Sequence, residues 1–140
     1  MPRSEIPLPS TPGPSLPALQ EERDRIAGIA ERMIGSTHRA ALRGVVHELM
    51  SFLPAHFHRE EAPGGPLATA LAEDPGQAWH VEAIQDRHAL ILEGLEELWS
   101  NLDGDALTED ERAEATRIGR LLQDHEAREL RLLERRPPTQ

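Results

Sequence analysis

The chain has 140 residues and a formal net charge of −10, with no cysteine and with all 15 of its Lys and Arg positions filled by arginine. This length suits one domain with its own core. The composition excludes disulfide bonds, thiolate metal ligands and cysteine nucleophiles, and the acidic balance disfavours a nucleic-acid surface. Because neither a membrane-length apolar run nor an apolar secretory core is found, we expect a cytoplasmic protein that does not enter a membrane.

The first 16 residues form a segment rich in proline, with Pro2, Pro7, Pro9, Pro12 and Pro14. Proline breaks helices and central strands, so residues 1–16 are predicted to be a flexible arm. A solvated leader is the simplest interpretation, although the arm could also contact an unknown protein partner. Residues 17–136 are predicted to form the folded domain, and residues 137–140 a short tail.

Apolar residues recur at alternating three- and four-residue steps in four segments, which is the pattern of amphipathic helices. The apolar positions predicted to face the core are Leu19, Ile26, Ile29 and Met33, then Leu42, Val45, Leu49 and Phe52, then Val81, Ile84, Ile91, Leu95 and Leu98, and finally Ala115, Ile118, Leu121 or Leu122, and Leu132. We predict helices over about 17–34, 37–61, 77–101 and 108–136, with Ser36 or Thr37 capping the second. Thr108 and Glu111 form a capping box at the start of the fourth. Residues 62–76 are expected to connect the second and third with about one turn of helix. The predicted fold is all-α, an up-down-up-down four-helix bundle.

Six polar residues fall on the stripes that should face the core: Glu22, His56, Glu60, His88, His125 and Glu129. The spacing H-x-x-x-E occurs twice, at His56/Glu60 and His125/Glu129, which places each pair on one helix face. Burying an unpaired carboxylate is unfavourable, so these groups need cations or protons. Imidazole and carboxylate ligands suit iron, manganese or zinc. A metal site between the helices is therefore predicted.

These motifs resemble the hemerythrin-like (HHE cation-binding) family of non-haem diiron four-helix bundles. The similarity covers roughly residues 19–133 and rests on H-F-H-R-E-E at 56–61, D-R-H ending at His88, and H-E-A-R-E at 125–129. The chain departs from the family pattern in two places. Glu22 stands where the first helix of the family carries a histidine, and Ile84 replaces the additional third-helix histidine of the oxygen-carrying members.

The resemblance implies a cofactor of two iron ions, with Glu60 and Glu129 bridging them. Glu22 and His56 would complete one iron, and His88 and His125 the other. Zinc or manganese would also fit these ligand types. Three carboxylates favour Fe(III), and Ile84 leaves coordination open, so we expect a protein that reacts with or senses dioxygen, peroxide, NO or iron rather than carrying oxygen reversibly.

The interpretation leaves open whether the protein is an enzyme, with weak oxidase, peroxidase or ferroxidase-like activity as the candidates. The alternative is a degenerate bundle that holds no metal and acts as a protein-interaction module. His38, His47, His58 and His80 are assigned no role in the site, and His58 is expected to be exposed and His80 to be a surface or cap residue. Glu61, Glu96, Glu97 and Glu126 are interpreted as solvated, with Glu61 able to assist the site.

Overall fold

A computed structural model describes the backbone of residues 16–102 and 106–134 and the side chains of residues 20–102 and 106–133. The predicted arm, apart from Leu16, and the predicted tail of residues 137–140 lie outside the described residues, as does the predicted inward side chain of Leu19. The described part is helical and contains no strand. None of its helices is both long enough and apolar enough to cross a lipid bilayer.

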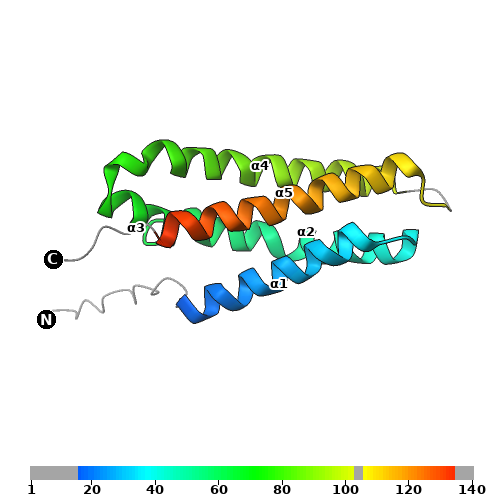
Figure 1. Ribbon diagram of the computed structural model, residues 1–140, viewed down its shortest axis with the longest axis horizontal. Helices are drawn as coiled ribbons and strands as arrows, with labels where there is room; N and C mark the ends of the chain where they lie inside the picture. The colour runs from blue at the N-terminus through cyan, green and yellow to red at the C-terminus, as the bar shows by residue number, and fades with distance from the viewer. Residues whose placement is uncertain (1–15, 103–105, 135–140) are drawn as a thin grey trace, which may run out of the picture.

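Four long helices lie alongside one another (Figure 1). They are α1 (Leu16–Gly35), α2 (Arg39–Glu61), α4 (Ala78–Asn101) and α5 (Glu109–Glu134). Helix α1 packs against α2 and α5, and α4 also packs against α2 and α5. Each long helix therefore has two long neighbours, and the four surround a common core. The predicted all-helical bundle is confirmed at this level.

The helix boundaries confirm one of the two predicted N-terminal caps and contradict the other. The capping box is present, because the Glu111 amide donates to the Thr108 hydroxyl and the Thr108 amide donates to the Glu111 carboxylate. The predicted cap of α2 at Ser36 or Thr37 is wrong. His38 is the N-cap, without a side-chain cap bond, and the Ser36 hydroxyl instead donates to the Arg32 carbonyl. Serine can bond backwards into the preceding turn, so its position alone did not define the cap.

The connection between α2 and α4 contains more helix than expected. It forms α3 (Pro66–Glu73) and a 3₁₀ turn, η1 (Pro75–Gln77). Gly64 supplies the turn after α2 with a φ of 84°, a conformation that glycine adopts without steric cost. The apolar residues of α3 include Leu67, which is buried. Because α3 contacts α2, α4 and α5, it covers one end of the bundle.

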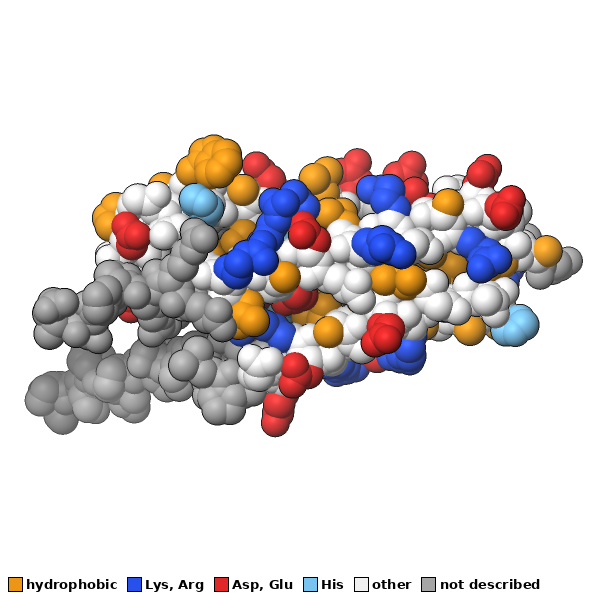
Figure 2. Space-filling model, in the orientation of Figure 1, with side chains coloured by type: hydrophobic (Ala, Val, Ile, Leu, Met, Phe, Trp, Pro, Cys, Tyr) orange, Lys and Arg blue, Asp and Glu red, His pale blue; other side chains and the backbone are white. Residues whose placement is uncertain are grey.

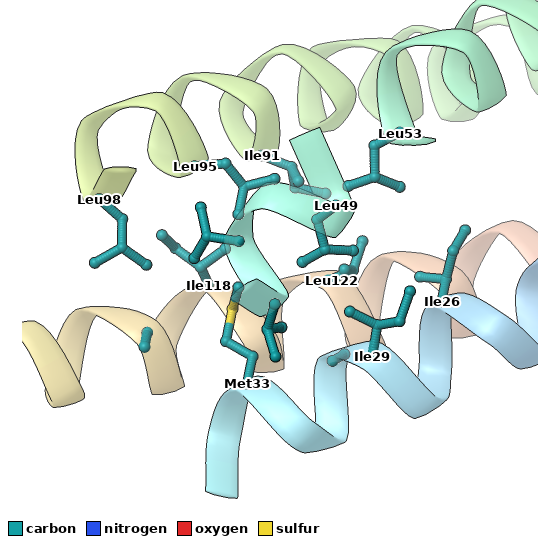
Figure 3. Close-up of a cluster of buried hydrophobic side chains, with 14 of the residues drawn as sticks. Ile26, Ile29, Met33, Leu49, Leu53, Ile91, Leu95, Leu98, Ile118 and Leu122 are labelled. Carbon is teal, nitrogen blue, oxygen red and sulfur yellow. The ribbon is translucent and has the colours of Figure 1, made fainter. Parts of the chain in front are cut away.

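The main apolar core lies between the four long helices, mainly in the part of the bundle away from α3 (Figure 3). Nearly all the described apolar residues predicted to be inward are buried, most of them in this core, at about 1.5–3 kcal/mol for each large side chain removed from water. The fully buried ones include Ile26, Ile29, Met33, Leu49, Ile91, Leu95, Ile118 and Leu122. A second apolar cluster, of Leu67, Val81, Ile84 and Leu132, lies near α3.

Helices α1 and α5 approach closely where glycine removes a side chain. A Cβ atom built on Gly119 of α5 would lie 2.7 Å from Cγ1 of Ile34 and 3.1 Å from the carbonyl oxygen of Ala30. Any larger residue would force the two helices apart or displace Ile34. This contact helps to bring α1 against the face of α5 that carries the polar residues described next.

Candidate metal centre

Polar side chains interrupt the apolar core at one level of the bundle. Along α4, His88 lies between Ile84 of the second apolar cluster and Ile91 of the main core. The same order recurs on α5, where the polar segment lies between Leu122 and Leu132. The buried members are His56 and Glu60 of α2, His88 of α4, His125, Glu126 and Glu129 of α5, and Arg23 of α1. We call these seven residues the polar layer.

One group in the polar layer comprises Glu60, His88, His125 and Glu129, whose ligand atoms all lie within 4.8 Å of one another. Nε2 of His88 is 3.2 Å from Oε1 of Glu60, and Nε2 of His125 is 3.2 Å from Oε2 of Glu129. Three helices supply these four ligands. We call this group the tetrad.

A second group comprises His56, Glu126 and Glu129, again with ligand atoms within 4.8 Å of one another. Nε2 of His56 lies 4.0 Å from Oε1 of Glu126 and 3.2 Å from Oε2 of Glu60. Glu129 belongs to both groups, and Glu60 lies beside both. We call the second group the triad. Two neighbouring positions for a metal ion therefore share carboxylates.

Many polar atoms of the imidazoles and carboxylates in this layer lie close together but have no hydrogen-bond partner. The atoms that are buried and have no hydrogen-bond partner include Nε2 of His56, His88 and His125, both carboxylate oxygens of Glu60 and Glu126, and Oε2 of Glu129. Native proteins rarely leave so many buried polar atoms unsatisfied, because each one costs free energy. A bound cation accepts lone pairs from imidazole and carboxylate together, so the donor set fits a metal ion.

Two carboxylates lie on the outer nitrogens of the histidines. Oε1 of Glu22 is 2.6 Å from Nδ1 of His56, and a carboxylate oxygen of Glu61 contacts Nδ1 of His88. Such contacts fix the tautomer of a ligating histidine, leaving Nε2 without a proton and turned toward the metal. His56 and His88 therefore each have a carboxylate at Nδ1 and a free Nε2, which is the arrangement of a histidine that binds a metal ion.

Of the six residues predicted as ligands, the structure brings together five: His56, Glu60, His88, His125 and Glu129. Glu22 is not among the residues of either group. It lies between Nδ1 of His56 and the Arg59 guanidinium, at 2.6 Å from each, and is partly exposed. Direct ligation by Glu22 stays a prediction, and its contacts are those of a carboxylate that orients His56.

The interpretation of Glu126 as a solvated residue is wrong. Only 8% of Glu126 is exposed, and it belongs to the triad. A signal was present, because Glu126 follows buried Leu122 by four residues and precedes Glu129 by three. The predicted inward stripe placed only His125 in the core, whereas the buried face of α5 is wide enough to include both His125 and Glu126.

Arg23 was not singled out from the sequence, yet it is 8% exposed and reaches the polar layer. Its Nη2 atom donates to Oε1 of Glu129 at 3.4 Å, and its Nε atom lies 4.0 Å from Oε2 of Glu126. Arg23 precedes Ile26 by three residues, as an inward position would. Arginine is rarely buried without a partner, so helical spacing alone does not indicate that Arg23 lies in the core.

The four histidines expected to lie outside the site, His38, His47, His58 and His80, are all exposed. Glu96 and Glu97 are exposed as predicted. Glu61 is exposed along part of its length but contacts His88, in keeping with the assisting position expected for it.

Proximity of the charges alters protonation in the layer. Burial opposes the charged form of His56 and His88. The nearby carboxylates Glu60, Glu22 and Glu126 nevertheless raise the pKa of His56 to about 9. In the same way, Glu129, Glu60 and Glu61 raise the pKa of His88 to about 10. Burial and the charges of Glu129 and Glu60 raise the pKa of Glu126 to about 8. Without a metal ion, the raised pKa values of His56, His88 and Glu126 favour protonation of these groups, which reduces repulsion between the buried carboxylates.

The two neighbouring carboxyl groups of Glu60 and Glu129 have pKa values shifted in opposite directions. Burial and the proximity of Glu129 raise the pKa of Glu60. Burial also opposes ionisation of Glu129, but the proximity of Glu60, His125 and His88 lowers the pKa of that carboxyl well below its usual range. Glu129, the residue shared by tetrad and triad, is therefore the most firmly anionic carboxylate of the layer.

A pocket of about 290 Å³ between α4 and α5 reaches the polar layer at His125. Its apolar wall includes Ile84 and Leu132, and its other lining residues include Trp79, Arg87, Arg128 and Arg131. Figure 2 shows several basic side chains over the face formed by α4 and α5. His125 itself is fully buried, so the pocket ends against the polar layer, and its arginines favour an anion or a polar ligand there.

Comparison of the chain with protein-family models, with curated proteins and with solved structures finds no match in any of the three.

Proposed function

We propose that this protein is a non-haem metal protein that binds iron in the polar layer, with the hemerythrin-like arrangement of an up-down-up-down bundle. Reversal of the chain between consecutive long helices supports that topology (Figure 1). The observation that carries the proposal is the set of buried imidazole and carboxylate atoms, drawn from α2, α4 and α5, that face one another without hydrogen bonds.

Iron is the metal favoured because three imidazoles and three carboxylates make a mixed, strongly anionic ligand set. Such ligands stabilise Fe(III) over Fe(II), and the two positions allow up to two ions. Zinc and manganese would use the same atoms. When bound, iron would supply electrons to a small oxidant such as dioxygen or peroxide.

The function that follows is reaction with, or sensing of, dioxygen, peroxide, NO or iron itself. The pocket that reaches His125 supports access for a ligand of this size. Weak oxidase, peroxidase or ferroxidase-like activity is part of the same proposal. Reversible oxygen carriage is disfavoured because Ile84, a pocket residue, stands where another imidazole would be needed.

Metal content tests this proposal directly. Metal-free protein would be exposed to Fe²⁺ without oxygen, passed through a desalting column and analysed for iron and for absorption after oxidation. We expect iron to be retained by the native chain and by the matched control His58→Ala, which changes an exposed histidine. His125→Ala should lose most of it.

A native chain that retains no iron, zinc or manganese would overturn the proposal. That result would favour the alternative, a bundle that acts only through protein contacts. Trp79 and Leu90, which are 73% and 55% exposed, would then be the first residues to examine.

A further inference from the structure

Arg23 brings a cation of the chain's own into the proposed metal centre. Arginine remains protonated in proteins, so this positive charge is permanent. Arg23 is 8% exposed and lies within the core-facing surface of α1. The proposed ligands do not explain why a guanidinium is buried here.

The contacts of Arg23 are specific to the triad. Its two close carboxylates are Glu129, at 3.4 Å, and Glu126, at 4.0 Å. Both belong to the triad, whereas the tetrad contains only Glu129. The guanidinium therefore lies on the triad side of the layer.

Arg23 also takes one of the two oxygens of the shared carboxylate. It binds Oε1 of Glu129, while Oε2 of Glu129 lies 3.2 Å from Nε2 of His125 in the tetrad. A carboxylate that joins two metal ions commonly offers one oxygen to each. With Oε1 bound to Arg23, Glu129 is arranged to serve the tetrad alone.

Charge leads to the same result. Metal binding requires ionised carboxylates and neutral imidazoles, so Glu60, Glu126 and Glu129 would carry three negative charges. Arg23 offsets one of them, and a single divalent cation offsets the other two. A second divalent cation would leave the buried layer with excess positive charge, which is unfavourable in a region of low dielectric constant.

We propose that the two positions fill unequally: one divalent cation binds the tetrad, and Arg23 takes the place of a second cation at the triad. The triad then accepts metal only when the guanidinium is displaced. This inference rests on the proposed metal binding and specifies its stoichiometry.

Titration of metal-free, full-length protein with Mn²⁺ tests the inference through binding alone. The native chain should take up one Mn²⁺ tightly, and a second at least roughly 100-fold more weakly. Arg23→Met should lower the Kd of the second step at least about tenfold. Arg23→Lys retains a cation at this position and should keep the second step weaker than it is in Arg23→Met.

Arg32→Met is a matched control, because Arg32 lies on the same helix but pairs with Glu48 at the surface. It should leave both binding steps unchanged. Glu126→Gln in the Arg23→Met background should remove the second step and retain the first. Electron paramagnetic resonance adds an independent readout. Two Mn²⁺ ions bound in the adjoining tetrad and triad would couple magnetically, whereas a single bound Mn²⁺ ion has no partner with which to couple.

The outcomes separate the two proposals. No metal uptake by the native chain would defeat the proposed function itself. Two equally tight Mn²⁺ ions in the native chain, seen as a coupled pair, would overturn the unequal filling while leaving metal binding intact, and this result does not depend on whether any variant folds. An unchanged second step in folded Arg23→Met would overturn it too.

Discussion

Glu22 contacts His56 on the side of the ring away from Glu60, with 2.6 Å between its Oε1 atom and the Nδ1 atom of that ring. Glu61 makes the corresponding contact with His88. Glu22, predicted as a ligand, and Glu61, predicted to be solvated or to assist the site, are thus arranged to orient imidazoles. The proposed metal centre therefore includes residues beyond the candidate ligands, and this has a measurable consequence.

Glu22→Gln should weaken metal binding without changing how many ions bind. Loss of such an outer partner typically lowers metal affinity by about 10- to 100-fold, because the ring loses its fixed tautomer and orientation. Isothermal titration with Zn²⁺ measures both the Kd and the stoichiometry. Glu21→Gln, which changes the exposed neighbouring residue, is the control. A lost equivalent of metal would instead identify Glu22 as a direct ligand.

The stability of the metal-free protein should fall as pH rises. The pKa values of His56 and His88 are raised to about 9 and about 10, so the stability that their protonation contributes is complete below their ordinary pKa of 6.5 and is lost as pH approaches those values. Glu126 acts in the same direction, because its pKa is raised from 4.5 to about 8 and the native state retains its proton longer than the unfolded chain. Urea unfolding followed by circular dichroism should give lower midpoints at each step from about pH 6 to about pH 10.

Added metal should reverse that dependence. Metal ions bind ionised carboxylates and neutral imidazoles, so their stabilising effect grows as the protons leave. Unfolding midpoints with and without Zn²⁺ should therefore diverge as pH rises. Glu126→Gln should flatten the metal-free profile, since it removes one of the titrating groups. A metal-free protein that becomes more stable between about pH 6 and about pH 10 would contradict the pKa directions.

Much of the fold and most of the site could be predicted from the sequence because both depend on helical periodicity. Every third or fourth residue of a buried face is constrained, so Ile91, Leu95 and Ile118 were predicted to be inward and are. His125 and Glu129 followed from the same rule. A single inward stripe was too narrow a description for α5, where Glu126 is also buried.

Other features depend on which helix faces which, and no single segment encodes that. Arg23 is buried only because α1 packs against α5, where Gly119 allows a close approach and Glu129 offers a partner. The same applies to Glu22, whose role depends on the position of His56 on another helix. Helical periodicity predicts which face is inward, but it does not identify which residue meets which across the core.

The apolar core should provide most of the stability, independently of metal. Leu49 is fully buried in the main core, so Leu49→Ala should lower the free energy of unfolding by about 2–5 kcal/mol through lost burial and the remaining cavity. Leu90→Ala changes a leucine that is 55% exposed and should stay within about 0.5 kcal/mol. Urea unfolding of metal-free protein measures both. Equal losses would mean that the helices pack with different faces inward.

The pocket beside His125 should control how fast small ligands reach the metal. Ile84 forms part of its apolar wall, so the larger side chain of Ile84→Trp should narrow this pocket of about 290 Å³ beside His125. We expect azide to bind iron(III)-loaded protein at least about tenfold more slowly, while iron content stays unchanged, because entry is narrowed and the ligands are untouched.

Stopped-flow absorption measures the azide-binding rate, and Leu90→Trp, on an exposed part of α4, controls for the added indole. An unchanged rate in Ile84→Trp would place the entry route elsewhere in the bundle. Reduced iron content would show instead that Ile84 shapes the ligand positions themselves.

Arg128 and Arg131 line the same pocket, so raising the salt concentration should slow azide entry in the native chain by screening their charges. The same salt should have less effect on NO, which is uncharged, and this difference separates electrostatic attraction from simple steric access.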